Sequence, residues 1–485
     1  MPRPLEELRK ERLKKLEKIR ALGFNPYLSF FERQHLISQV REAKLGTKAV
    51  VAGRIMAWRE HGKIVFADLM DQSAKIQILF RSDRLSPTNL KLLSLLDIGD
   101  FIGAVGKTFK TDAGELTIEA DDLVLLTKSL RTIPTKSGLT DVEERYRQRY
   151  VDLLVNPEVR AVFDTRTKIV SALRAFMDRN GFLEVDTPVL QPVYGGASAR
   201  PFVTHHEALD NDFYLRISDE LYLKRLIVGG LEKVYEIGHD FRNEGIDRSH
   251  NPEFTMLEFY WAYADYEKLM DFTEEMFISL LKDIHGSLIL EYQGRRFNFK
   301  PPWKRLTYRQ AILKATGIDI DKADSEEKLQ GAIKKHGITL EERRPVGYGA
   351  VLDALYKQTT RPGLEGPLFL TERPTEFVSL AKRLPADPRK TASFQLLVAG
   401  EELINAYNEL NDPIDQAERW QESEKLGDKG KSEHEAMDED YIRALEYGMP
   451  PTAGWGLGID RLTAVLTNQP SLKDTILFPT LRPEK

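Results

Sequence analysis

The sequence predicts an α+β protein that carries a separate small β-barrel ahead of its main domain. Its 485 residues exceed the size at which one hydrophobic core stops growing, so at least two domains are expected. Between residues 49 and 126, short alternating apolar runs are separated by glycines, a spacing typical of a small barrel. Beyond residue 151, helical stretches such as 168–179 mix with strand-like stretches such as 254–260. This mixture predicts a mixed or antiparallel sheet with flanking helices.

The composition argues against several classes of protein. No apolar run approaches the roughly 18 residues of a membrane span, so neither a membrane protein nor a membrane partner is expected. Cysteine is absent, which removes disulfides and thiolate metal ligands and favours a reducing compartment. The N-terminal segment is rich in glutamate and lacks an apolar core, so we expect a cytoplasmic protein without a leader. The net charge of -5 means that a nucleic-acid contact needs local basic patches. No DNA partner is expected.

Four segments are expected along the chain. Residues 1–47 form a basic helical extension, 48–128 the barrel, 129–150 a polar linker, and 151–485 the main domain, with an insertion at roughly 265–345. In the extension, apolar residues at helical spacing lie among lysines and arginines, which predicts a basic amphipathic helix. Such a helix can pack against the protein with its charges in solvent or contact RNA, and the pattern fits both.

Residues 234–260 predict a long hairpin. One strand ends in Phe-Arg-Asn-Glu at 241–244, and the chain returns after a polar loop as a second apolar strand. Because side chains alternate along a strand, one surface is expected to present a guanidinium, two carboxylates and two rings. The side chains on this surface are Arg242, Glu244, Phe254, Glu258 and Tyr260. A hairpin with merely solvated charges would explain any single Arg/Glu pair, but it explains the whole string poorly.

A glycine-rich segment at 454–458 leads into Ile459-Asp460-Arg461 and an apolar helix. Glycines admit close backbone approach, and Arg461 lies in the opening turn of the helix, where N–H groups and the helix dipole favour phosphate. The segment is not a dinucleotide fingerprint, because its glycines stand at alternate positions without a preceding βαβ strand. A generic glycine-rich helix start remains the alternative.

A third segment, 401–410, predicts a strand with Asn405, Tyr407 and Glu409 on one face. Glu402 falls on the other face unless a β-bulge intervenes. Taken alone, the segment is an ordinary amphipathic strand.

Together these three segments resemble motif 2, motif 3 and the intervening strand of class II aminoacyl-tRNA synthetases, in subclass b, which handles lysine, aspartate and asparagine. Residues 181–188, Gly-Phe-Leu-Glu-Val-Asp-Thr-Pro, look like motif 1 of that family, which implies a homodimer formed through this region. The strings at 195–202 and 220–225 are similar to those of the lysine-specific members. The resemblance covers the chain from about residue 49 to 483.

The resemblance implies a role for each matching position. Arg242 and Arg461 would be the catalytic residues, because adenylate formation depends on positioning and on cations that neutralise developing charge. The ATP-binding positions would be Arg242, Asn243, Glu244, His250, Asn251, Phe254, Glu402, Leu403, Gly458, Ile459, Asp460 and Arg461. Phe254 would stack on adenine opposite Arg461. The lysine-binding positions would be Gly196, Glu220, Arg242, Glu258, Tyr260, Asn405, Tyr407 and Glu409.

The expected metal site departs from the family. The family usually has two glutamates seven residues apart that hold Mg²⁺ against ATP, whereas here the pair is Gln395 and Glu402. An amide ligand brings no charge, so weaker Mg²⁺ binding is expected unless a neighbour such as Glu401 substitutes.

The carboxylates around the expected pocket favour a cationic substrate. Together with this charge, the resemblance implies ATP-dependent activation of L-lysine and its transfer to the 3′ end of tRNA(Lys). A relative specific for aspartate or asparagine is one alternative, although the carboxylates would repel aspartate. A relative that no longer charges tRNA and serves as an RNA-binding or regulatory protein is another, although Arg242 and Arg461 are both present.

The barrel resembles the anticodon-binding OB-fold of the same family. Phe66 and Gln77 are symmetric about residues 71–72, so a hairpin turning there would place them side by side to stack on a base and read its edge. Both match the central-base contacts of the family, and Arg54 is a weaker anticodon-binding candidate. Ordinary barrel residues would also fit these positions.

Overall fold

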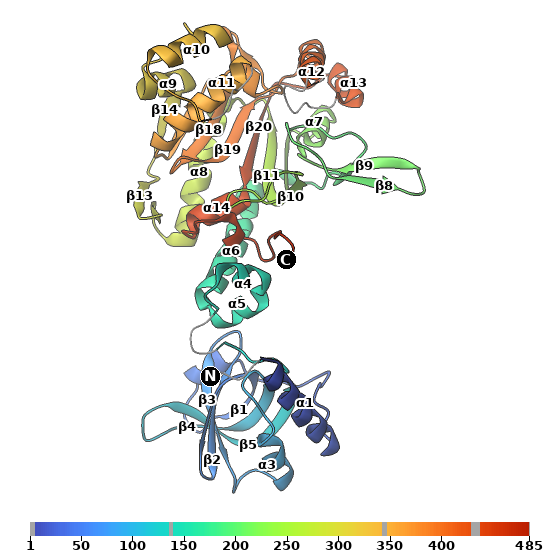
Figure 1. Ribbon diagram of the computed structural model, residues 1–485, viewed down its shortest axis with the longest axis vertical. Coiled ribbons are helices and arrows are strands. Elements are labelled where there is room, and N and C mark those ends of the chain that lie inside the picture. The colour runs from blue at the N-terminus through green and yellow to red at the C-terminus, as the bar shows by residue number, and fades with distance from the viewer. Residues whose placement is uncertain (1–4, 135–138, 342–346, 428–436, 485) are drawn as a thin grey trace. The chain divides into compact units, whose positions relative to one another are not determined.

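The computed structural model, shown in Figure 1, describes residues 5–134, 139–341, 347–427 and 437–484. The chain divides into two compact units, Met1–Asn156 and Pro157–Lys485. No helix among the residues described is long and apolar enough to cross a membrane.

The first unit is built around a closed five-stranded barrel with strand order β1-β2-β3-β5-β4. Its strands are β1 (Lys48–His61), β2 (Ile64–Met70), β3 (Lys75–Arg81), β4 (Phe101–Lys110) and β5 (Leu116–Thr127). Alternate side chains such as Ala67, Leu69 and Ile78 fill the interior and are buried. The predicted barrel is confirmed.

Among the described residues, five helices accompany the barrel: α1 (Leu5–Ala21), α2 (Ile37–Glu42), α3 (Pro87–Leu93), and α4 and α5 (Val142–Arg147 and Arg149–Val155) at the end of the unit. Ile19 of α1 is buried in the barrel core, and Arg12 donates hydrogen bonds to the carbonyls of Ile98 and Arg131 at 2.8 Å. The predicted amphipathic helix therefore packs against its own unit. Residues 129–150, predicted as a linker, hold α4 and the start of α5; residues 135–138 lie outside the described part.

The second unit is built on an eight-stranded mixed sheet with order β14-β15-β18-β19-β20-β11-β10-β6. Its strands are β6 (Leu183–Glu184), β10 (Lys233–Phe241), β11 (Glu253–Ala262), β14 (Lys304–Thr307), β15 (Leu368–Thr371), β18 (Ser393–Val398), β19 (Glu401–Asn408) and β20 (Thr452–Gly458). The central strands pair antiparallel, and the edge pairs β6·β10 and β14·β15 are parallel. The predicted α+β domain with a mixed sheet is confirmed.

The two faces of this sheet differ. One face, with Leu257, Phe259 and Trp455, packs against α6 (Pro157–Arg179), α8 (Tyr266–His285) and α14 (Ile459–Leu466) in the largest hydrophobic cluster. On the other face, Tyr260 and Tyr407 join a smaller cluster with α7 (Glu220–Val228), α12 (Pro413–Gly427) and α13 (Glu439–Glu446). In Figure 1 the helices α10 and α11 lie above the sheet on one side, and α12 and α13 on the other.

Residues 265–345, predicted as an insertion, divide into two parts. Helix α8 packs in the main core, whereas α9 (Tyr308–Thr316) and α10 (Glu326–Lys335), together with α11 (Tyr348–Leu355) beyond this range, form a separate cluster against β15. The remaining strands form small sheets: β7 (Leu190–Gln191), β8 (Val203–His206) and β9 (Asn211–Leu215); β12 (Ile289–Tyr292) and β13 (Arg295–Asn298); and β16 (Arg383–Leu384) and β17 (Asp387–Thr391).

Candidate active site

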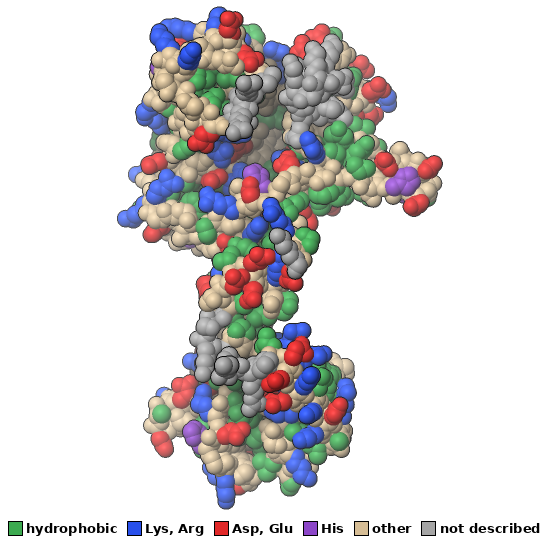
Figure 2. Space-filling view, viewed as in Figure 1, with side chains coloured by type: hydrophobic (Ala, Val, Ile, Leu, Met, Phe, Trp, Pro, Cys, Tyr) green, Lys and Arg blue, Asp and Glu red, His purple; other side chains and the backbone are tan. Residues whose placement is uncertain are grey.

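A cavity of about 1270 Å³ lies on the face of the eight-stranded sheet opposite α6, α8 and α14. In Figure 2 the surface is hollowed between the positions of α11 and α12, both of which contribute lining residues. The predicted site residues that line it are Gly196, Glu220, Arg242, Glu244, His250, Asn251, Phe254, Glu258, Tyr260, Glu402, Leu403, Asn405, Tyr407, Gly458, Asp460 and Arg461. Segments far apart in the sequence therefore converge on one cavity.

Strand register explains this convergence. Cross-strand neighbours point to the same side of a sheet, so each row across β19, β20 and β11 contributes to one face. One row joins Asn405, Gly456 and Glu258, and the next joins Tyr407, Gly454 and Tyr260. The predicted hairpin, β10 paired antiparallel with β11, is confirmed.

The arginine end of the cavity differs in detail from the prediction. Strand β10 ends at Phe241, so Arg242 and Glu244 lie beyond the strand. The backbone N–H of Arg242 still donates to the carbonyl of Pro252 at 2.8 Å, and the pairing between β10 and β11 stops there. The Arg242 guanidinium lies 5.0 Å from the centroid of the Phe254 ring. A cation and an aromatic surface thus face the same space.

Arg461 enters from the first turn of α14. Its Nη1 donates to the main-chain carbonyl of Glu402 at 2.5 Å, which fixes the arginine beside β19. The neighbouring Asp460 lines the cavity, but its carboxylate accepts from Arg166 (2.5 Å) and from the backbone N–H of Thr255 (2.9 Å). Asp460 therefore anchors the start of α14.

Two residues predicted for ATP do not line the cavity. Asn243 is exposed in the loop after β10, where its backbone N–H donates to the carbonyl of Arg200. Ile459 is buried in the main hydrophobic cluster. The sequence motif places both beside true lining residues, but their side chains point elsewhere.

A β-bulge carries Glu402 onto the cavity face. Leu396 pairs with Ile404 and Leu397 pairs with Glu402, so Leu403 is the extra residue. Gln395 Nε2 then donates to Glu402 Oε2 at 2.6 Å. Glu401 instead forms an ion pair with Arg361 at 3.4 Å and does not line the main cavity. The bulge that the sequence left open is present.

An internal lysine lies behind the carboxylate end of the cavity. Lys224 Nζ lies 2.5 Å from Glu220 Oε1 and forms an ion pair with Glu409, and all three side chains are buried. Burial alone would lower the pKa of Lys224, but the two carboxylates raise it above its ordinary value, so the ammonium stays charged. Tyr407 donates its hydroxyl to Glu220 at 2.7 Å.

Two glycines make room for these groups. A Cβ at Gly454 would lie 2.0 Å from Glu409 Oε1 and 2.5 Å from a ring carbon of Tyr260, so any larger residue would displace the carboxylate or the ring. Gly196 has φ +85°, which favours glycine, and a Cβ there would lie 3.0 Å from Ser218. Both glycines are needed where the backbone approaches the site.

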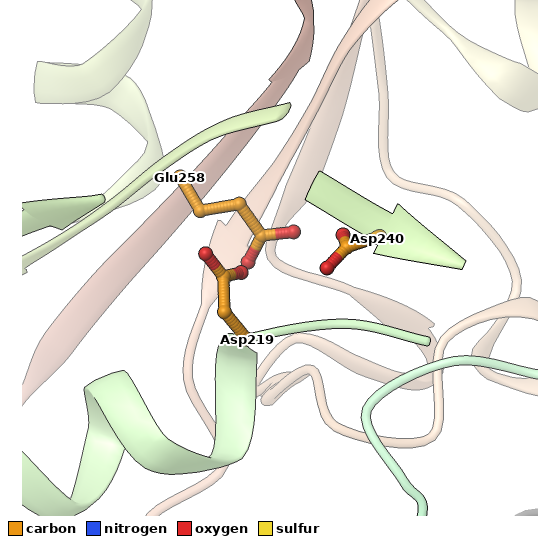
Figure 3. Close-up of side chains that lie close together, drawn as sticks. All are labelled: Asp219, Asp240 and Glu258. Atoms are coloured by element: carbon orange, nitrogen blue, oxygen red, sulfur yellow. The ribbon is translucent and has the colours of Figure 1, made fainter. Parts of the chain in front are cut away.

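Two further carboxylates, Asp219 and Asp240, meet the lining residue Glu258 behind the cavity wall (Figure 3). Asp219, Asp240 and Glu258 are buried, and each offers an oxygen within 4.8 Å of the others. Arg216 Nε lies 3.2 Å from Asp240 Oδ1. Burial and repulsion by Glu258 raise the pKa of Asp219 well above its ordinary value, and burial raises the pKa of Glu258 to about 8. Oxygen donors of this kind suit a hard cation, but protons can also neutralise them.

Sequence reasoning missed Lys224, Asp219 and Asp240. Lys224 had a detectable signal, because it follows Glu220 by four residues in a helix whose other inward positions are apolar. No local pattern marks Asp219 or Asp240, which come together only when α7 packs against β10.

The barrel carries its predicted residues on one outer face, but their predicted register is wrong. Phe66 pairs with Leu79, and Gln77 pairs with Asp68, so Phe66 and Gln77 are diagonal rather than direct neighbours. Both still point outward, since the alternate residues fill the barrel. Arg54 lies on the same face, with its guanidinium 4.1 Å from the Phe101 ring centroid.

Comparison with known proteins agrees with this architecture. Residues 141–482 match the family of class II tRNA synthetases (D, K and N), and residues 49–126 match the OB-fold nucleic acid binding domain. The chain belongs to the class II tRNA synthetases of the D, K and N group.

Its relatives in that group include proteins named lysine–tRNA ligase. The protein of that name from Carboxydothermus hydrogenoformans is 50% identical over 483 residues, covering 99% of both chains. Those from Moorella thermoacetica and Syntrophomonas wolfei are each 48% identical, covering 98% and 99% of this chain and 97% and 98% of their own.

Proposed function

We propose that this protein is a lysine–tRNA ligase, which activates L-lysine with ATP and transfers it to the 3′ end of tRNA(Lys). The observation that carries the proposal is the polarity of the cavity. The buried carboxylate of Glu220 lies at one end, with Glu409 behind the wall there, and the guanidinium groups of Arg242 and Arg461 lie at the other end. Such a cavity accommodates ammonium groups and phosphates together.

The arrangement suits adenylate formation. The carboxylate of the substrate attacks the α-phosphorus of ATP, the bond to the β-phosphate oxygen breaks, and pyrophosphate leaves. Arg242 and Arg461 neutralise the charge that develops on the phosphates, and no side-chain base is needed because the nucleophile is already ionised. A terminal hydroxyl of tRNA then attacks the acyl carbon and releases AMP, while its proton passes to the phosphate or to solvent.

For ATP, we assign Phe254 and Arg461 to the two sides of the adenine ring, with His250, Asn251 and Glu244 around the nucleotide. For lysine, Gly196 and Glu220 receive the α-ammonium, and Glu409 and Tyr260 receive the ε-ammonium. The walls of the lysine pocket are Glu258, Asn405 and Tyr407. The assignment to lysine is supported by Glu258, Tyr260, Asn405 and Tyr407, which line the cavity from adjacent rows of one sheet.

Glu402 and Gln395 are the residues that would hold Mg²⁺, which supplies positive charge to the ATP phosphates when bound. The fit is partial, because Glu402 is the one carboxylate of the pair and Gln395 donates its amide nitrogen to it. We expect the protein to need more Mg²⁺ than a relative with two glutamates.

tRNA would be recognised through the outer face of the barrel, where Phe66, Gln77 and Arg54 can contact anticodon bases. We also propose a homodimer through the motif 1 region. Strand β6 is at the edge of its sheet, and Leu183 and Leu190 nearby are exposed, as at a self-association surface. We expect the protein to act in the cytoplasm, where tRNA is charged.

Amino-acid-dependent exchange between ATP and pyrophosphate, measured with each of the twenty amino acids, tests this function. We expect exchange with lysine far above that with any other. Exchange led by aspartate or asparagine would show a different specificity. The absence of exchange with every amino acid would favour a relative without charging activity.

A further inference from the structure

Behind the wall of the cavity that we propose for a lysine substrate lies a buried lysine ammonium of the chain itself. Lys224 lies one helical turn after Glu220 in α7, and its side chain is 0% exposed. Its ammonium contacts Glu220 and Glu409 at once, through ion pairs with both. These are the carboxylates assigned above to the two ammonium groups of the substrate.

Glu220 and Glu409 differ in the partners that they have besides Lys224. Glu220 also accepts the hydroxyl of Tyr407 at both oxygens, at 2.7 and 2.8 Å. Glu409 has buried oxygens that lack hydrogen bonds of good geometry, and Lys224 is its ion-pair partner among the residues described. Removing the ammonium would therefore leave Glu409 as an uncompensated buried charge.

The groups around Lys224 show why this matters for specificity. The ammonium faces Glu220, Glu409 and the rings of Tyr260 and Tyr407, at 6.0 and 5.7 Å from their centroids, and Tyr441 of α13 adds a buried hydroxyl. An isolated buried carboxylate takes up a proton instead of keeping its charge. A protonated Glu409 would accept a neutral side chain as readily as an ammonium.

We propose that Lys224 is a positioning and specificity residue, a built-in counter-ion that holds the Glu220 and Glu409 carboxylates in place and correctly spaced before lysine enters. This inference rests on the proposed function. An incoming lysine brings two ammonium groups to these carboxylates, whereas a neutral amino acid brings only one. Lys224 thereby selects for lysine without touching the reacting atoms.

The test uses Lys224→Met, Lys224→Arg and Lys224→Ala in the full chain, assayed by lysine-dependent ATP/pyrophosphate exchange. Methionine keeps the length and removes the charge, so we expect the KM for lysine at pH 7 to rise about tenfold or more. The KM for ATP should stay within about twofold, because the arginine end is unchanged. Lys224→Arg should retain most lysine affinity. Lys282→Met, on exposed α8 surface, is the matched control.

Two readouts separate a counter-ion from a purely structural residue. In Lys224→Met the lysine KM should fall toward the wild-type value as pH rises, because the unpaired carboxylates lose their protons; the wild-type KM should change less. In Lys224→Ala, propylammonium chloride, which matches the deleted atoms, should restore exchange, while sodium chloride at equal ionic strength should not.

The outcomes are distinguishable. Wild-type protein that shows no lysine-dependent exchange refutes the proposed function itself. If the wild type is active, a Lys224→Met protein with unchanged lysine KM at every pH overturns the counter-ion role. The counter-ion role is also overturned if Lys224→Ala folds but loses exchange activity that propylammonium does not restore, and Lys224→Arg shows the same loss. If Lys224→Met does not fold, the arginine and alanine variants decide between the same two results.

Discussion

At the scale of single residues, the site depends on a small number of buried charges whose partners come from different elements. Glu409 follows β19, Lys224 lies on α7, and Glu258 lies on β11. The chemical types were readable from the sequence, and so was the expectation of a cationic substrate. The ion pair between Lys224 and Glu409 was not, because 185 residues separate them and only tertiary packing joins them.

Glu409→Gln should sharply weaken lysine use while leaving ATP binding near normal. The change keeps the shape but removes a buried charge, which costs about 2–5 kcal/mol, or about 30-fold or more in kcat/KM for lysine. Exchange kinetics with lysine and ATP varied separately provide the measurement. Unchanged lysine kinetics would remove Glu409 from the pocket.

Glu258 should couple lysine binding to proton release. The folded protein keeps a proton on Glu258 up to a pKa of about 8, whereas an ordinary glutamate releases it near 4.5. This group therefore makes the free energy of unfolding fall as pH rises from about 4.5 to 8. An incoming ammonium lowers the pKa again and expels the proton, although the nearby Asp240 and Glu220 oppose ionisation.

At pH 7, calorimetric titration with lysine in two buffers of different ionisation enthalpy should therefore show release of up to about one proton per site. Glu258→Gln should abolish that release. Equal apparent enthalpies in both buffers for the wild type would contradict the assignment.

At the scale of elements, alternation along strands predicted the β10·β11 hairpin and the face of β19, because these depend only on local pattern. Alternation could not predict the β-bulge at Leu403, because the same pattern of side chains fits a strand with the bulge and a strand without it. It also misplaced the β2·β3 register. Asp71 accepts from the backbone N–H groups of Ser73 and Ala74, so the turn spans four residues and its centre lies one position later than predicted.

The prediction for the metal site depends on the β-bulge, which places Gln395 and Glu402 in contact. Because Gln395 and Glu402 are in contact on the cavity side, Gln395→Glu should add a negative charge to the metal shell and lower the Mg²⁺ concentration for half-maximal exchange. Glu401→Gln is the matched control, since Glu401 pairs with Arg361 instead, and it should leave the titration unmoved. A titration that Gln395→Glu does not shift would exclude Gln395 from the metal site.

At the scale of the whole molecule, the chain consists of two compact units, Met1–Asn156 and Pro157–Lys485. The division into a barrel and a sheet domain was predictable from strand spacing and length. The position of the break was not, because the polar stretch read as a linker contains helices that belong to the first unit.

Phe66→Ala should reduce tRNA charging but spare exchange, because we assign the barrel to anticodon binding and the cavity of the second unit to adenylate formation. Loss of one stacked base costs about 1–3 kcal/mol. Phe30→Ala, another exposed ring of the same unit outside the barrel strands, is the control. Equal loss of charging and exchange would indicate that Phe66 serves folding instead.

The most direct test of the central claim is to incubate the protein with ATP, Mg²⁺, all twenty amino acids and unfractionated tRNA, and to identify by mass spectrometry which amino acid is esterified to which tRNA. The account predicts lysine on tRNA(Lys) alone. Aspartate or asparagine on their own tRNAs, or no esterified tRNA in the presence of ATP, would contradict it.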